Sequence, residues 1–95
     1  MLTSKQRAAL RSLSNDLTPI MQVGKSGIGD ELITSVDNAL EARELIKMSV
    51  LDTAPVTARE AAEVLAEATG AEPVSVVGRR FVLYRPSKKK PKITV

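Results

Sequence analysis

Helix-length and strand-length apolar patterns alternate along this chain, and this alternation constrains the fold more than any other feature of the sequence. Within residues 45–51, for example, Ile46, Met48 and Val50 alternate with Lys47 and Ser49, which is typical of a strand with one buried face. The patterns predict helices at 3–15, 30–43 and 57–69, and strands at 20–23, 45–51, 74–77 and 80–85. Two right-handed strand–helix–strand crossovers followed by a hairpin predict a two-layer α+β fold. Its order is α-β-α-β-α-β-β, with a four-stranded mixed sheet.

Local signals define where several of these elements begin or turn. Thr3 or Ser4 can cap the first helix, and Thr57 with Glu60 has the spacing of a capping box at the start of the third. The dipeptide Gly78-Arg79 fits a two-residue hairpin turn with glycine first. With one Tyr, one Phe and no Trp, aliphatic side chains and Ala must fill the core. We expect two helical stripes to face that core, formed by Leu10, Leu13 and Leu17 and by Ala61, Val64, Leu65 and Ala68.

Chain length and the missing residue types limit the class of protein. A chain of 95 residues favours one domain, which we place at residues 1–87, followed by a basic and mobile tail at residues 88–95. The absence of Cys and His excludes disulfides, a thiolate zinc site and the commonest general base. No apolar run has the about 20 residues of a membrane span, and the N-terminus lacks the apolar stretch of a signal peptide. These features predict a cytoplasmic monomer with no cofactor or metal.

Charge is distributed unevenly along the chain. Residues 1–78 hold 7 basic and 11 acidic residues, a net charge of −4. Residues 79–95 hold no acidic residue and 7 basic ones, which are Arg79, Arg80, Arg85, Lys88, Lys89, Lys90 and Lys92. A basic end of this kind indicates a polyanionic partner such as nucleic acid, or else a tail that only keeps the protein in solution.

The sequence between the first strand and the second helix is suited to binding a phosphate. Gly24-Lys25-Ser26-Gly27 places two glycines, a cation and a hydroxyl just before a helix. Glycines let a backbone approach a phosphate closely, and amides at a helix start attract anions. The spacing excludes the nucleotide-binding P-loop, since Pro19 stands where its first glycine belongs, and it does not fit the dinucleotide-binding fingerprint. What remains is a G-x-x-G loop, as in RNA-binding KH-type domains, or a plain flexible turn.

Three separated segments resemble a known family. Residues 19–27 (PIMQVGKSG), 44–47 (ELIK) and 82–86 (VLYRP) are similar to those of YhbY-like proteins, the stand-alone bacterial form of the CRM domain (chloroplast RNA splicing and ribosome maturation). The similarity extends from about Leu2 to Lys92. It implies a two-layer αβ domain similar to the C-terminal domain of bacterial translation initiation factor three. It also implies association with precursors of the large ribosomal subunit.

The resemblance further implies which residues bind RNA. In the family, the G-x-x-G loop and nearby basic residues contact the RNA backbone, so the loop residues here are Gly24, Lys25, Ser26 and Gly27. The supporting cations would be Lys47, Arg79, Arg80 and Arg85, with Lys88, Lys89 and Lys90 contributed by the tail.

The sequence departs from the family pattern at two positions. Gly29 stands where the family often has a helix-capping Thr, so either Asp30 takes over the cap or the helix start is looser. Ser49 stands where the family often has a second lysine on the second strand, which makes that face less basic than usual.

Several residues have two readings that the sequence leaves open. Tyr84 could stack on a base or belong to the core. The acidic stripe of Glu60, Glu63 and Glu67 could bind a protein or be a solvated helix face. The leading hypothesis is a non-catalytic protein that binds structured RNA and assists large-subunit assembly. The alternative is a protein-binding adaptor on assembling ribosomes. A phosphate-handling enzyme is disfavoured, because no histidine, cysteine or carboxylate cluster accompanies the loop.

Overall fold

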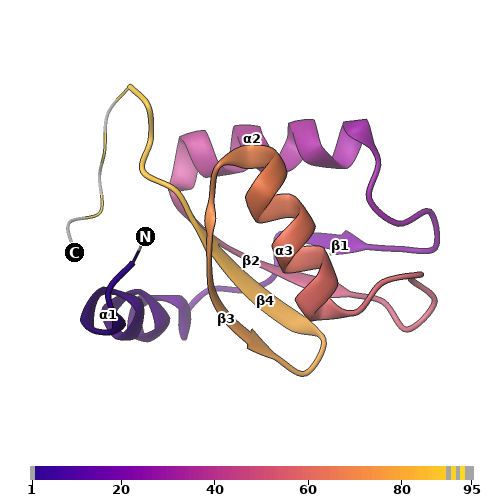
Figure 1. Cartoon of the computed structure of the whole chain (residues 1–95), viewed down its shortest axis with the longest axis horizontal. Helices are drawn as coiled ribbons and strands as arrows, with labels where there is room; N and C mark the ends of the chain where they lie inside the picture. The colour runs from indigo at the N-terminus through magenta and orange to yellow at the C-terminus, as the bar shows by residue number, and fades with distance from the viewer. Residues whose placement is uncertain (1, 90, 92, 94–95) are drawn as a thin grey trace.

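The computed structural model describes residues 2–89, 91 and 93, which form a two-layer α+β domain with one four-stranded sheet (Figure 1). The elements are α1 (Ser4–Ser14), β1 (Met21–Val23), α2 (Asp30–Arg43), β2 (Leu45–Val50), α3 (Ala58–Thr69), β3 (Glu72–Val77) and β4 (Arg80–Tyr84). This order and the mixed sheet agree with the prediction from the sequence. No helix within the described part of the chain is long and apolar enough to cross a membrane.

The sheet has the strand order β1-β2-β4-β3. β1 and β2 are parallel and joined by α2, whereas β4 lies antiparallel to both β2 and β3. Consequently the C-terminal ends of β1 and β2 meet the N-terminal end of β4 at one end of the sheet. This end carries the loop after β1, the connector after β2 and the β3–β4 turn.

The two faces of the sheet are covered differently. α2 and α3 pack on one face, where the larger core cluster includes Val36, Leu40, Met48, Leu65 and Phe81. The other face is covered at one end only, by α1, where a smaller core cluster is formed by Leu10, Leu45, Val74, Val82 and Tyr84. The rest of this second face remains open, and Figure 1 shows α1 beside the sheet and opposite α2.

The ends of the helices follow the predicted local signals. Thr3, not Ser4, caps α1, and a capping box with Gln6 completes its first turn. At α3, the Thr57 hydroxyl accepts from the Glu60 amide at 3.1 Å, and the Glu60 carboxylate accepts from the Thr57 amide at 3.0 Å. These hydrogen bonds lower the pKa of Glu60, so this member of the acidic stripe serves the helix start. Gly70 ends α3 in the left-handed conformation.

Three expected core positions and several element bounds differ from the prediction. Leu13 is 51% exposed, Val64 is 46% exposed and Ala68 is exposed too, because α1 and α3 each contact the sheet along one stripe and these side chains lie at its margin. β3 begins at Glu72, two residues earlier than expected. It therefore contains Pro73, which an edge strand tolerates because one row of its backbone groups has no partner strand.

Candidate nucleic-acid interface

The G-x-x-G segment forms a tight turn after β1. The Gly27 amide donates to the Gly24 carbonyl at 2.9 Å, and Gly27 has a φ of 71°, a conformation that favours glycine. Lys25 and Ser26, between the two glycines, are exposed. The turn therefore presents one ammonium group and one hydroxyl to solvent from a defined backbone.

The connector after β2 supports this turn. The Leu51 amide donates to the Val23 carbonyl at 2.9 Å, which joins the start of this connector to the end of β1. A Cβ atom added to Gly27 would lie 3.1 Å from Cγ of Pro55, and one added to Gly24 would lie 3.7 Å from Cδ1 of Leu51. Gly27 is thus packed against the connector, whereas Gly24 has ordinary van der Waals room.

Helix α2 starts without a side-chain cap. Gly29 is the N-cap residue and makes no capping bond, and Asp30 and Glu31 occupy the first turn. The sequence left two alternatives for this helix start, a cap by Asp30 or a start without a side-chain cap. The first is wrong, because Asp30 lies inside the helix, and the second describes the structure. The two carboxylates balance the positive end of the helix dipole, so Lys25 has to supply the attraction for an anion at this turn.

The β3–β4 turn brings basic residues to the same end of the sheet. Gly78 has a φ of 60° and Arg79 follows it, as expected for a two-residue hairpin turn. The Arg79 carbonyl accepts from the Val50 amide at 2.7 Å, which holds the turn against the end of β2. The Arg79 guanidinium lies 3.7 Å from a carboxylate oxygen of Asp52, and both side chains are exposed. Such an exposed ion pair is weak, so the guanidinium can exchange partners.

The open face of the sheet carries Lys47 and Arg80. Arg80 pairs with Ser49 on β2 and with Val77 on β3, and Ser49 in turn pairs with Gln22 on β1. Side chains of directly paired residues share a face, so one row crosses the whole sheet toward the G-x-x-G turn. Lys47 lies two residues before Ser49 and therefore on the same face. The structure thus brings Lys47, Arg79 and Arg80 to the half of the molecule that carries the turn.

Arg85 does not belong to this surface, which corrects the expectation from sequence. Its side chain is 6% exposed and lies at the opposite end of β4. The guanidinium donates to the carboxylate of Asp37, to the Thr69 carbonyl at 2.9 Å and to the carboxylate of Glu41 at 3.3 Å. With these acceptors around it, Arg85 joins α2, α3 and the end of β4, and its guanidinium is turned away from solvent.

The start of the tail is also held in place. The amides of Lys88 and Lys89 donate to the Glu41 carboxylate at 3.1 and 3.3 Å, and the Ser87 hydroxyl donates to it at 2.6 Å. These hydrogen bonds, led by that of Ser87, lower the pKa of Glu41 from 4.5 to about 2. The backbone of Lys88 and Lys89 is therefore bonded to α2, both side chains are exposed, and Lys90 lies outside the described residues.

The carboxylate of Glu44, whose role was not predicted from the sequence, completes the attachment of the tail. Glu44 follows α2 with a φ of 65° and is fully buried. Its carboxylate accepts from the Ser87 amide at 2.6 Å and from the Ile93 amide at 2.7 Å. The tail is anchored at the C-terminal end of α2, and the G-x-x-G turn precedes the N-terminal end. Since α2 has 14 residues, the two sites are separated by about 21 Å of helix.

Tyr84 lies in the smaller core cluster and is 6% exposed. Burial, and then the negative charge of Glu44, raises the pKa of its phenol. Of the two interpretations of this residue, core packing is correct, and stacking on a base is excluded by its burial.

The described residues do not contain a group of three or more acidic side chains placed to hold a metal ion.

The structure is that of a small αβ domain with a G-x-x-G turn at one end of its sheet. Comparison of the sequence with known protein families identifies the family. Residues 2–85 match the CRS1 / YhbY (CRM) domain. The protein therefore belongs to the CRM domain family.

Individual relatives support this assignment over nearly the whole chain. A Bacillus subtilis protein named probable RNA-binding protein YqeI is 45% identical over 93 residues, which cover 98% of this chain and 97% of that protein. A Haemophilus influenzae protein named RNA-binding protein is 32% identical over 88 residues, which cover 93% of this chain and 89% of its own. The solution structure of SAV1595 from Staphylococcus aureus, for which RNA binding is proposed, has 47% identity and a TM-score of 0.75. That similarity covers 93% of this chain and 92% of SAV1595.

Proposed function

We propose that this protein binds structured RNA of the large ribosomal subunit, or of its precursors, and assists assembly of that subunit in the cytoplasm without a catalytic step. Membership of the CRM family and the RNA-binding names of its relatives support RNA as the ligand. The ribosomal destination rests on the resemblance to YhbY-like proteins.

The observation that carries the proposal is the convergence of the G-x-x-G turn with Arg79, Arg80 and Lys47 on one half of the molecule. The turn packs on the connector after β2, and the last residue of β2, Val50, donates its amide to the Arg79 carbonyl. Cations on three separate segments therefore lie toward the same end of the sheet without depending on a flexible tail. Such an arrangement suits the phosphates of a folded RNA, whose positions are fixed relative to one another.

The chemistry assigned to each group follows from its position. Lys25 and Ser26 would contact phosphate oxygens at the turn, where Gly24 allows the backbone to approach closely. Arg79 would release Asp52 and pair with a phosphate, and Arg80 and Lys47 would extend the contact over the open face. Lys88 and Lys89 lie at the far end of α2, so they would contact RNA only if it extends along the domain.

The test compares Lys25→Glu with Lys89→Glu, two charge reversals at opposite ends of α2. We expect Lys25→Glu to weaken binding to a large-subunit ribosomal RNA fragment by about 1–3 kcal/mol, the scale of a charge-assisted hydrogen bond. The slope of log affinity against log salt should fall by about one unit, because one fewer counterion is released. Fluorescence anisotropy across a salt series measures both quantities.

Lys89→Glu is the matched control and should have the smaller effect. Equal losses for the two variants would mean that the turn is not the main contact and that overall charge provides the attraction. Weak binding of the unmodified protein with little salt dependence would instead favour the protein-binding adaptor, which needs few phosphate contacts.

A further inference from the structure

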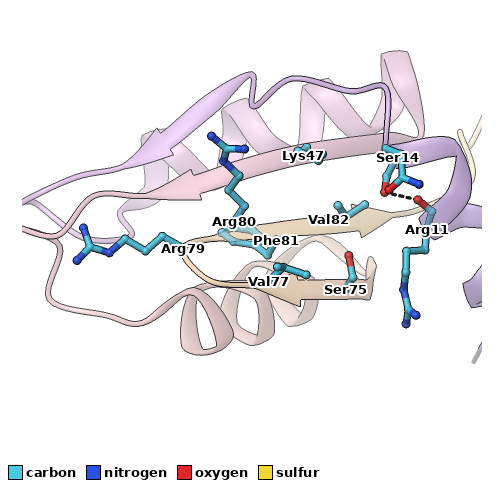
Figure 2. A pocket seen from close by; sticks show the side chains of 10 residues that line it. Arg11, Ser14, Lys47, Ser75, Val77, Arg79, Arg80, Phe81 and Val82 are labelled. Atoms are coloured by element: carbon cyan, nitrogen blue, oxygen red, sulfur yellow. Dashed lines mark hydrogen bonds between the residues drawn. The ribbon is translucent and has the colours of Figure 1, made fainter.

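The open part of the second sheet face contains a concavity that the G-x-x-G turn does not explain. It has a volume of about 480 Å³ and lies between the end of α1 and the β3–β4 hairpin. Figure 2 shows its lining residues: Arg11 extends from α1 beside β3, Lys47 lies on β2, and Arg80 extends from β4 toward β2. This volume lies within the range of pockets that hold small organic ligands.

The charge of this concavity is one-sided. Arg11, Lys47, Arg79 and Arg80 all line it, and among the described residues none with a carboxylate does so. Arg11 is exposed, and its contribution was not expected, since the RNA-binding cations predicted from the sequence were Lys25, Lys47 and basic residues after position 78. The concavity therefore attracts an anion from three elements, α1, β2 and β4.

Its floor is not that of a simple phosphate site. Val77, which is 73% exposed on its edge strand, contributes most of the aliphatic surface, and Val82 of the smaller core cluster lies beneath it at 3% exposed. Ser14, Asn15 and Ser75 add neutral hydrogen-bonding groups. A phosphate alone would use the cations and leave the aliphatic surface in water. A nucleotide has a phosphate for the cations, a flat base for the valines and base edges for the hydroxyl and amide groups.

We infer that this concavity binds one unpaired nucleotide of an RNA whose backbone is held at the G-x-x-G turn; the inference therefore rests on the proposed function. In the absence of an exposed aromatic ring here, the guanidinium planes of Arg11 and Arg80 are the groups on which a base can stack. The row of paired residues from Val77 to Gln22 spans three strand spacings, about 14 Å, so one RNA can reach both sites.

The experiment uses two RNA hairpins that differ only in one bulged uridine. The unmodified protein should bind the bulged hairpin about tenfold more tightly than the fully paired one, the factor expected from one charge-assisted hydrogen bond. Arg11→Gln removes a cation from the concavity, and Ser75→Ile fills it without changing the charge. Both variants should reduce this preference to less than about threefold, while Lys5→Gln, elsewhere on α1, should leave it unchanged.

Each result decides between the two proposals. Equal affinity of the unmodified protein for both hairpins, or equal behaviour of Arg11→Gln and Lys5→Gln, would overturn the nucleotide site and leave RNA binding intact. Failure to bind either hairpin would overturn the proposed function together with the site. Thermal melting identifies folded variants, and Arg11→Gln decides alone if Ser75→Ile does not fold, because Arg11 is exposed and supports no core contact.

Discussion

Arg85 shows how the role of one residue depends on its surroundings in the fold. It directly follows β4, which begins with the exposed Arg80, yet its guanidinium is buried against acceptors on α2 and α3. Asp37 lies 48 positions away in the sequence, so no local pattern relates the two residues. Only the packing of α2 beside the end of β4 converts an apparent RNA contact into an internal ion pair.

We expect Arg85→Met to destabilise the domain by about 2–3 kcal/mol, since it leaves Asp37 without its buried partner and the Thr69 carbonyl without its donor. The loss is smaller than for a fully buried pair, because the carboxylate of Asp37 is half-exposed. Arg79→Gln, which breaks only an exposed pair, should change stability by less than about 1 kcal/mol. Urea denaturation of both variants measures the difference.

For RNA affinity, we expect the order of the two variants to be reversed. Arg79→Gln should weaken binding, whereas Arg85→Met should leave the affinity of the folded protein unchanged. A stable Arg85→Met variant that had lost RNA binding would show that this arginine does reach the RNA.

At the level of the element, the G-x-x-G turn contains two glycines with different structural requirements. Gly27 has a positive φ and lies against Pro55, whereas Gly24 has neither constraint. The sequence predicts the turn but does not distinguish the two glycines, because their conformations depend on how the connector after β2 packs. Helix bounds, in contrast, were predictable from local chemistry: the capping box at Thr57 and Glu60 forms as its spacing indicates.

The two glycines give a matched pair of variants. Gly27→Ala should cost about 1–2 kcal/mol of stability, because a side chain is strained at this φ and meets Pro55 at 3.1 Å. Gly24→Ala should change stability by less than about 0.5 kcal/mol but still weaken RNA binding, since its Cβ would separate the backbone from a phosphate. Urea denaturation of each variant measures the backbone strain, and RNA titration measures the loss of contact with the RNA. An unaltered affinity of Gly24→Ala would argue against close approach of the RNA backbone at this glycine.

Across the whole molecule, cations that the sequence places in one basic run are divided between two ends. Arg79 and Arg80 lie with the G-x-x-G turn, and Lys88 and Lys89 lie beyond the C-terminal end of α2. This division could not be predicted from charge alone, because it depends on the carboxylate of Glu41, which appears in the sequence only as part of a polar helix face. The tail is therefore part of the folded domain at its start, and its attachment should respond to the protonation of that carboxylate.

This attachment predicts a pH dependence of stability at the acidic end. The pKa of Glu41 is about 2 in the folded protein, below its usual 4.5, because the Ser87 hydroxyl and the Lys88 and Lys89 amides donate to the charged form. A group whose pKa is lowered by folding binds more protons in the unfolded state, so its contribution is complete above pH 4.5 and is lost as the pH falls toward 2. Glu41→Gln should therefore flatten the fall of the urea midpoint between these pH values.

Ser87→Ala removes the hydroxyl that lowers this pKa most and keeps the Ser87 amide that donates to Glu44, so it should partly flatten the fall of the urea midpoint in the same pH window. Glu63→Gln, on the exposed face of α3, should retain the full dependence, because this carboxylate lies away from the tail. The urea midpoint followed by circular dichroism between pH 5 and pH 2 compares the four proteins. If Ser87→Ala keeps the slope of the unmodified protein while Glu41→Gln loses it, the Ser87 hydroxyl does not lower this pKa, and the attachment at the end of α2 is not the cause.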